Sequence, residues 1–394
     1  MTPLTSISTG AQGSILFQGA VGAAPIHVKT VTGQTFNNPI VLGVDVIFES
    51  LGPLLPAPLA QGDITFNGAI NGGFNLIVNT TGVTNFNGPL GAVTTLASVT
   101  TDAGGSVQFG GTGTVTTLSG SNFTGTYVRT TGAQTYNDTV TLVANTMLES
   151  SNAGNLTFGS TVDGGFDLKL NTAGVTAFNA PVGFTTPLMS ITTDAQGSTQ
   201  LNAGTVKTVG AQTFNDPVTL MKDTTLTSTT LGDVTFNNKL DGAFALTVNT
   251  AGKTIFNEQV GTTTALTSIT TDAPGSVQFQ DTKTVAPGVT PLVIIKTSGA
   301  QTYNDQALLA SDTTFAGGAD VVFNNKIDGA FNLTVNTAGQ TQFNDQVGAT
   351  ARLKTITTDA PGTVRFKDSV GTTTGGVTTF AIKIYTTGAQ TFRD

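Results

Sequence analysis

An aromatic residue followed by asparagine recurs at a short and nearly constant interval along the whole chain, and this pair constrains the fold more than any other feature. The complete pairs are Phe36-Asn37, Phe66-Asn67, Phe86-Asn87, Tyr136-Asn137, Phe178-Asn179, Phe214-Asn215, Phe236-Asn237, Phe256-Asn257, Tyr303-Asn304, Phe323-Asn324 and Phe343-Asn344. Partial pairs, which keep only the ring or only the amide, stand at Phe17, Phe109, Phe158, Asn202, Phe279, Phe366 and Phe392. A short fixed period predicts a solenoid, in which each repeat is a coil that buries its apolar face against its neighbours.

The residue types favour strands over helices. Glycine makes up 48 of 394 residues, charged residues only 10%, and the sequence has neither tryptophan nor cysteine. Threonine, valine, asparagine and glycine dominate, and alternating segments such as Val234-Thr235-Phe236 are separated by Asn-Asn, Asp-Gly and Ala-Gly turns. Alternation with a period of two indicates half-buried strands, so we predict an all-β parallel β-helix.

A longer repeat of four coils is superimposed on the coil. Its boundaries lie near residues 62, 154, 232 and 319, and the interval between its first two ring positions is the same in every copy, as between Phe236 and Phe256. Counting every ring position as one coil predicts about 18 coils of roughly 20–24 residues in a single continuous solenoid, residues 1–394, without a separate globular domain. At about 4.8 Å per coil this solenoid would be roughly 85 Å long.

The repeated side chains predict ladders that run along the solenoid. Each ring should lie over the ring of the preceding coil, and the asparagine amides should bond from coil to coil. A second, smaller ladder is predicted from the phenylalanines that follow the Asp-Gly or Asn-Gly turns, namely Phe74, Phe166, Phe244 and Phe331.

Coil length varies at particular places. The variable intervals follow Phe17, Phe109, Leu201, Phe279 and Phe366, and a further insertion spans Leu51 to Leu59. Loops of this kind leave a solenoid on its side and often carry its function. Two of them, at residues 121–127 and 281–287, have aromatic or polar residues suited to contact with glycans or proteins, although such loops can also merely decorate a stalk. The candidate binding residues are Ser121, Asn122, Phe123 and Tyr127.

Charge and hydropathy argue against nucleic acid and membrane partners. Sixteen basic against 24 acidic residues give a net charge of −8, and the basic residues are scattered, whereas phosphate binding needs clustered cations. No apolar stretch approaches the length of about 18 residues that a membrane span requires, so we expect no membrane insertion by this segment.

The ionisable residues predict neither catalysis nor a cofactor. The acids recur in register, at Asp163, Asp241 and Asp328 and at Asp102, Asp194, Asp272 and Asp359, which is typical of turn residues rather than of an active site. His27 is the only histidine and is expected to be an ordinary surface residue. Weak Ca²⁺ binding at the stacked turns, which include Asn71-Gly72 and Asp163-Gly164, is the one cofactor possibility left open.

With these repeats aligned, segments such as residues 130–138 resemble the β-strand-repeat region of large bacterial surface adhesins of the filamentous-haemagglutinin-like and autotransporter-like kind. The resemblance covers essentially the whole chain, and its motifs are architectural. It implies a right-handed parallel β-helix, export to the outer cell surface and a role as an adhesin stalk or fibre. Because residues 4–7 match residues 266–269 inside a repeat, we expect a segment of something longer or a subunit that stacks end to end.

These observations favour a structural, non-catalytic protein of the bacterial cell surface or extracellular space. Its expected partners are glycans or proteins of a host or neighbouring cell, or further copies of itself. The alternatives are a self-assembling extracellular fibre subunit and a polysaccharide-processing or tail-spike-like β-helix.

Overall fold

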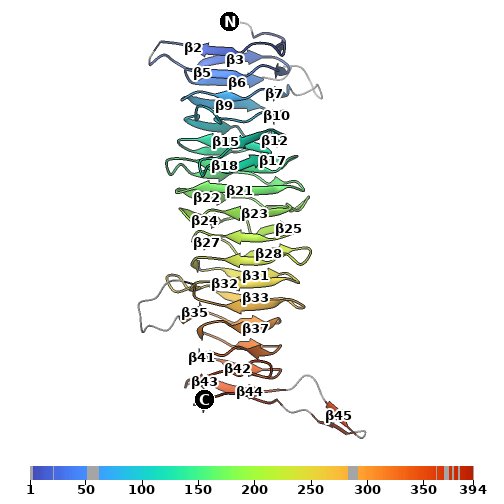
Figure 1. The fold of residues 1–394 in the computed structure, drawn as a ribbon, viewed down its shortest axis with the longest axis vertical. Helices are drawn as coiled ribbons and strands as arrows, with labels where there is room; N and C mark the ends of the chain where they lie inside the picture. Colours follow the sequence, from blue (N-terminus) through green and yellow to red (C-terminus); the bar gives the residue numbers. More distant parts are fainter. Residues whose placement is uncertain are drawn as a thin grey trace. The chain divides into compact units, whose positions relative to one another are not determined.

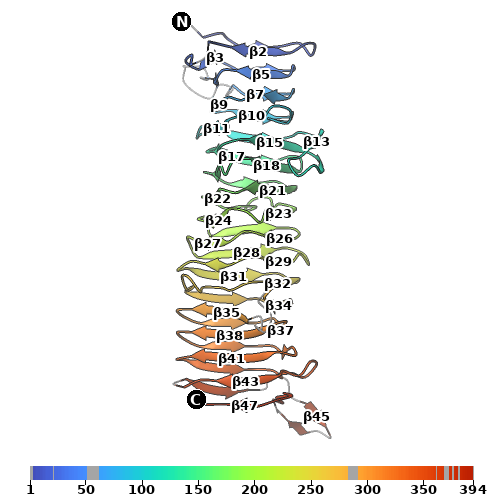
Figure 2. The ribbon, with the colours of Figure 1, turned by 60° about the vertical axis from the view of Figure 1, so that its left-hand side comes forward.

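The structure, a computed structural model, describes residues 3–20, 22–50, 62–282, 292–360, 362–367, 372–374, 377–379 and 382–393. The Leu51 to Leu59 insertion and the loop from residue 283 onward lie outside these ranges. The chain divides into two compact units, Met1–Ala203 and Gly204–Asp394. Figures 1 and 2 show the strands of each unit in successive layers, with the sequence advancing from layer to layer.

The first unit is built from three parallel sheets, one on each side of its coils. Sheet 1 stacks β1 (Ile7–Ser8), β4 (Gln34–Phe36), β7 (Ile64–Phe66), β10 (Val83–Phe86), β12 (Ser106–Phe109), β17 (Thr139–Leu142) and β20 (Val162–Asp163). Sheet 2 stacks β3 (Ile26–Thr30), β6 (Val46–Ser50), β9 (Asn75–Thr80), β11 (Ser98–Thr101), β16 (Gln134–Tyr136), β19 (Leu156–Phe158), β22 (Val175–Phe178) and β24 (Ser198–Leu201). Sheet 3 holds β2 (Ile15–Gln18), β5 (Ile40–Gly43) and β8 (Ile70–Asn71), followed across a bridge at Leu90 by β15 (Thr126–Thr130), β18 (Thr146–Ser150), β21 (Asp167–Thr172) and β23 (Ser190–Thr193).

The second unit repeats this arrangement. One sheet stacks β25 (Thr205–Thr208), β28 (Thr224–Ser228), β31 (Ala245–Asn249), β33 (Ser268–Thr271), β36 (Gln301–Tyr303), β39 (Val321–Phe323), β42 (Gln340–Phe343) and β44 (Thr363–Phe366). A second stacks β26 (Gln212–Phe214), β29 (Val234–Phe236), β32 (Lys253–Phe256), β34 (Ser276–Phe279), β37 (Gln306–Leu309) and β40 (Ile327–Asp328). The third side holds β27 (Val218–Leu220) and β30 (Leu240–Asp241), and then β35 (Leu292–Thr297), β38 (Asp312–Gly317), β41 (Asn332–Thr337), β43 (Thr355–Thr358) and β47 (Gln390–Thr391).

The two remaining strand pairs are antiparallel hairpins. They are β13 (Thr114–Thr116) with β14 (Asn122–Thr124) in the first unit, and β45 (Thr372–Thr374) with β46 (Val377–Thr379) in the second. Each hairpin falls where the sequence predicts an insertion, after Phe109 and after Phe366. Helices are absent from the described residues, and every other pairing between named strands is parallel, so the predicted parallel β-solenoid is confirmed.

Alternation places the rings inside. Residues two apart along a strand point to the same face, and the inward set of β7, Ile64 and Phe66, is fully buried. Phe66 is in register with Phe36 and Phe86, and its ring stacks on theirs at centroid distances of 5.5 and 5.6 Å. The predicted ring ladder therefore exists in sheet 1, and Tyr136, Phe158 and Phe178 form a corresponding ladder in sheet 2.

The asparagine ladder also exists. Asn87 Nδ2 donates to Asn67 Oδ1 at 2.8 Å, and Asn67 Nδ2 donates to Asn37 Oδ1 at 2.7 Å. The second unit repeats the pattern, because Asn344 donates to Asn324, and Asn324 to Asn304, each at 2.6 Å. Each amide thus links one coil to the next at the point where the strand turns.

The count of 18 coils is wrong, because the ring ladder changes sheets. Phe109 in sheet 1 is in register with Leu142, whereas Tyr136, the next ring in the sequence, is in register with Thr101 in sheet 2. The path from Phe109 to Tyr136 passes only one strand of the stack, β15, and so covers two-thirds of a turn. The second unit makes the same change, from Phe279 in β34 to Tyr303 in β36.

Each four-ring repeat is therefore shorter than four turns, and the solenoid has about 15 turns. Phe17 in β2 and Phe36 in β4 likewise lie on different sheets. At the two changes that begin with a tyrosine the stacked ring arrangement is interrupted: Tyr136 meets Phe109 edge-on at 88°, and Tyr303 meets Phe279 edge-on at 89°. That the two units form one continuous solenoid stays a prediction, as does its length.

The second predicted ladder is also wrong. Phe74 is 37% exposed, and its carbonyl accepts a hydrogen bond from the backbone N–H of Ala97 in the next coil. Phe166 is 38% exposed and pairs in the same way with Met189. Because no ring occupies the next coil at this position, these phenylalanines lie singly at the surface after their glycine turns.

Candidate functional site

A side feature of the first unit is the insertion at residues 111–125, whose β13–β14 hairpin leaves the stack beside β15 and β18 (Figure 2). Gly111 N–H donates to the Thr126 hydroxyl at the base of the hairpin, and the Thr114 and Thr124 hydroxyls lie 2.8 Å apart across it. The hairpin is thus an ordered element rather than a loose loop.

Two of the four predicted binding residues hold this hairpin in place and do not face solvent. Phe123 is 8% exposed and Tyr127 is fully buried, and both pack with Met147 in a small apolar cluster. The interpretation of this loop as a source of exposed aromatic side chains is therefore wrong for Phe123 and Tyr127. Ser121 and Asn122 are exposed as predicted.

Glu149 in β18 ties the hairpin to the stack. Its Oε2 accepts hydrogen bonds from the Tyr127 hydroxyl and from Leu118 N–H, the latter at 3.3 Å. Burial and the neighbouring Glu149 raise the pKa of Tyr127 well above its ordinary value, so the phenol remains a donor. Glu149 itself is 5% exposed.

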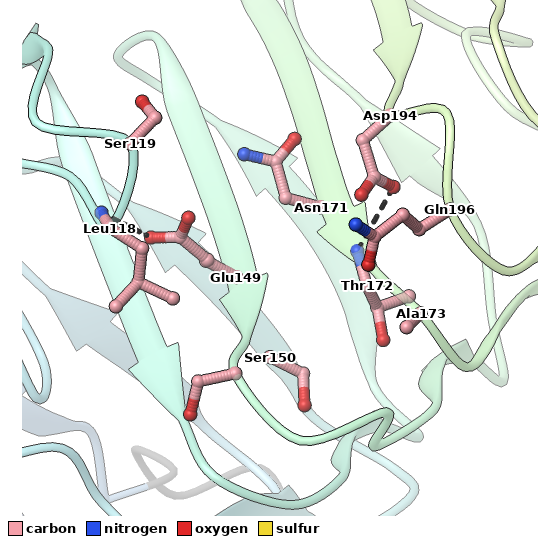
Figure 3. Close-up of a pocket in the computed structure, with 10 residues that line it drawn as sticks. Leu118, Ser119, Glu149, Ser150, Asn171, Thr172, Ala173, Asp194 and Gln196 are labelled. Carbon is pink, nitrogen blue, oxygen red and sulfur yellow. Dashed lines mark hydrogen bonds between the residues drawn. The ribbon is translucent and has the colours of Figure 1, made fainter.

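A cleft of about 340 Å³ opens between the hairpin and the outer surface of sheet 3 (Figure 3). Its floor is a column of outward side chains near the carboxyl ends of three successive strands: Glu149 comes from β18, Asn171 from β21, and Asp194 directly follows β23. The cleft is lined by Leu118, Ser119, Glu149, Ser150, Ser151, Asn171, Thr172, Ala173, Asp194 and Gln196.

The cleft is acidic. Burial raises the pKa of Asp194, the backbone N–H groups of Thr172 and Gln196 lower it, and the Glu149 carboxylate raises it again. The last contribution means that the two carboxylates repel each other across the cleft. None of the ten lining residues is basic.

Several lining groups already have structural partners. Asp194 Oδ1 accepts Thr172 N–H at 3.1 Å, and the Thr172 and Ser150 hydroxyls donate to carbonyls of the preceding coil. Three polar groups of the cleft are left to contact a ligand: the Gln196 side chain, the Asn171 carboxamide oxygen and the second Glu149 oxygen. In Figure 3, Asn171 lies between the two carboxylates.

Of the acids that repeat in register, the set that includes Asp102 and Asp359 lies outside the strands as predicted, whereas Asp163, Asp241 and Asp328 are the last residues of β20, β30 and β40. Asp102 Oδ1 accepts Thr80 N–H, and Asp359 Oδ1 accepts Thr337 N–H, both at 3.0 Å. In the other set, Asp163 Oδ1 accepts two backbone N–H groups of the following coil, from residues 185 and 186. Each carboxylate therefore fastens one coil to the next.

The remaining sequence predictions concern the histidine, a metal ion, a membrane span and the second candidate loop. His27 lies exposed on β3, in register with Ile47. Across the described ranges, no group of three or more histidine, cysteine or acidic side chains could hold a metal ion, and weak Ca²⁺ binding stays untested. Within the same ranges, no helix could serve as a membrane span. Of the second candidate loop, only Asp281 and Thr282 are described.

The cleft was missed in the sequence because its residues come from separate coils. One signal was present: residues 49, 79 and 102 are glutamate, asparagine and aspartate, and residues 149, 171 and 194 repeat this order. Comparisons with protein-family models, with curated proteins and with solved structures found no match to this chain.

Proposed function

We propose that the protein is a rigid stalk or filament segment of a secreted bacterial adhesin, without enzyme activity. The observation that carries the proposal is the set of ladders in each unit, in which successive coils are joined by parallel strands, stacked rings and bonded amides. Each buried phenylalanine contributes roughly 1.5–3 kcal/mol. This repetition gives resistance to bending along the stack, which a spacer needs and a catalyst does not.

The carboxylates argue in the same direction. Asp194 and Glu149 are the two acids of the cleft beside the hairpin, and one oxygen of each accepts a backbone N–H, so that oxygen holds the backbone rather than a substrate. A polysaccharide-processing enzyme would need an acid and a base facing its substrate. We further propose an outer cell-surface location, with partners on neighbouring or host cells.

The test combines shape with adherence. Electron microscopy of the purified chain is expected to show straight particles, and a cell displaying the chain beneath a known binding domain is expected to adhere better than one with a flexible Gly/Ser linker of equal residue number. Bent or beaded particles, or equal adherence with both spacers, would refute the stalk role. End-to-end filaments of the purified chain would instead support the fibre-subunit alternative.

A further inference from the structure

The first unit contains two columns of outward-facing Glu, Asn and Asp side chains in the same order, so the surroundings of one column can be compared with those of the other. In both copies the glutamate is in register with the asparagine of the next coil, and the aspartate accepts a backbone N–H from the threonine after that asparagine. The two columns are Glu49, Asn79 and Asp102, and Glu149, Asn171 and Asp194.

In the first column the glutamate is neutralised by a lysine. Lys29 lies directly across from Glu49 in the neighbouring strand β3, and its Nζ is 2.7 Å from Glu49 Oε2. A lysine ammonium is therefore the group that satisfies this glutamate where the chain itself supplies the partner.

In the second column the cation does not bond the glutamate directly, although the Arg129 side chain interacts with Tyr127, which donates to Glu149. Arg129 occupies the position across from Glu149, but its Nε and Nη2 donate to the carbonyls of Gly91 and Ala92, each at 3.0 Å. Glu149 instead receives the neutral donors Tyr127 O–H and Leu118 N–H. No lysine or arginine of the described residues forms an ion pair with Glu149, so the more deeply buried of the two glutamates has no direct cationic partner.

The cleft beside Glu149 has the shape and lining for that cation. Its acceptors are two carboxylates and two carboxamide oxygens, while Leu118 and Ala173 offer apolar surface. A lysine buries its methylene stem along apolar surface and places its ammonium among acceptors. The volume of about 340 Å³ lies at the low end of the range for small-molecule pockets, which suits one side chain.

We propose that this cleft binds the ammonium group of a lysine side chain from a partner polypeptide, with the ammonium between Glu149 and Asp194 and the stem against Leu118 and Ala173. The hairpin forms one wall, and its attachment to Glu149 fixes the position of the carboxylate. This inference goes beyond the stalk role and does not depend on it, because the cleft would bind lysine whether or not the chain is a spacer.

The test is a backbone-amide NMR titration of the full chain with the peptide Gly-Ser-Lys-Ser-Gly. We expect saturable shifts at residues 118–119, 149, 171 and 194, binding that weakens with added salt, and loss of the shifts when the lysine is acetylated. Glu149→Gln keeps the acceptor for the hairpin and removes the charge, so affinity is expected to fall about tenfold. Glu49→Gln, in the matched column, is the control and is expected to leave affinity unchanged.

A second variant tests whether the loss of affinity could instead come from a loosened hairpin. Asp194→Asn keeps the oxygen that accepts Thr172 N–H and is expected to weaken the peptide by a similar factor with amide exchange in residues 111–125 unchanged. Equal shifts with the acetylated peptide, unchanged affinity in both variants, or the same loss in Glu49→Gln would overturn the proposal. So would shifts caused by glucosamine but not by the peptide, since these would assign the cleft to amino sugars.

Discussion

Replacing Tyr136 with phenylalanine removes one oxygen atom from the interior of the first unit and tests how the ladder begins on a new sheet. Tyr136 and Gln134 are both fully buried, and the tyrosine hydroxyl donates to Gln134 Oε1 at 2.9 Å. The Gln134 Nε2 also donates inward, to the Glu149 carbonyl at 3.0 Å. In the second unit, Tyr303 donates to Gln301 at 3.0 Å in the same way.

Phenylalanine occupies the tyrosine position in three other copies of this motif, and in two of them the glutamine is buried. At Phe36 and Phe214 the hydroxyl is missing, and the buried Oε1 atoms of Gln34 and Gln212 have no hydrogen-bond partner. A buried acceptor left without a partner costs about 1–3 kcal/mol. We therefore expect Tyr136→Phe to lower the local free energy of opening by about 1–2 kcal/mol, and Phe214→Tyr to raise it by about 1 kcal/mol.

Hydrogen exchange at single amides is the suitable assay, because a long repeat array does not unfold in two states. The amides of residues 134–142 report on Tyr136→Phe, and those of residues 212–220 on Phe214→Tyr. Phe158→Tyr is the control: residue 156 is leucine, so the added hydroxyl has no acceptor two residues earlier and is expected to destabilise. Unchanged exchange in Tyr136→Phe, or destabilisation by Phe214→Tyr equal to that of the control, would refute the reasoning.

Three further predictions concern pH, glycine and the amide ladder. Asp138 and Asp305 are almost fully buried, and burial raises the pKa of each from 3.8 to about 6. The folded state therefore binds more protons than the unfolded state between pH 4 and 6, so the free energy of unfolding should fall as pH rises through 6, by on the order of 2 kcal/mol for each residue. Asn substitutions should flatten this pH profile in thermal melts. Gly242 has φ of +134° and a Cβ there would lie 2.3 Å from a backbone oxygen, so Gly242→Ala should lower the melting temperature, whereas Gly73→Ala, in open space, should change it little. Asn324→Ala removes two hydrogen bonds of 2.6 Å between side-chain amides and should speed backbone hydrogen exchange in both adjoining coils by an amount equivalent to about 1 kcal/mol. Hydrogen-exchange protection equal to that of the unmodified chain would contradict the ladder's contribution.

The local structure could be predicted from the sequence because each coil repeats the same physical problem. Burying Phe66 and bonding Asn67 need only a neighbour of the same kind one coil away, and the period supplies it. The number of turns could not be predicted, because the path from Phe109 to Tyr136 contains a hairpin. In the sequence this path resembles one long coil rather than two-thirds of a turn with an insertion, and only strand register distinguishes the two.

The cleft lay beyond sequence reasoning for a related reason. Glu149, Asn171 and Asp194 belong to three successive coils and become neighbours only through stacking. The burial of Phe123 was equally hidden, because alternation in a short hairpin does not say which face meets Met147. In both cases the missing information was contact between coils.

The change of sheet at Tyr136 and Tyr303 has a consequence for how such a chain can lengthen by gene duplication. In each unit, the repeat that begins at this tyrosine is shifted to the sheet that precedes the old one in the winding order. Copying one whole repeat would therefore rotate every following insertion by a third of a revolution relative to the preceding coils. Three copies would be needed before a loop again pointed in its original direction around the axis. Chains with one or two extra repeats would therefore display their side loops in new directions without any substitution.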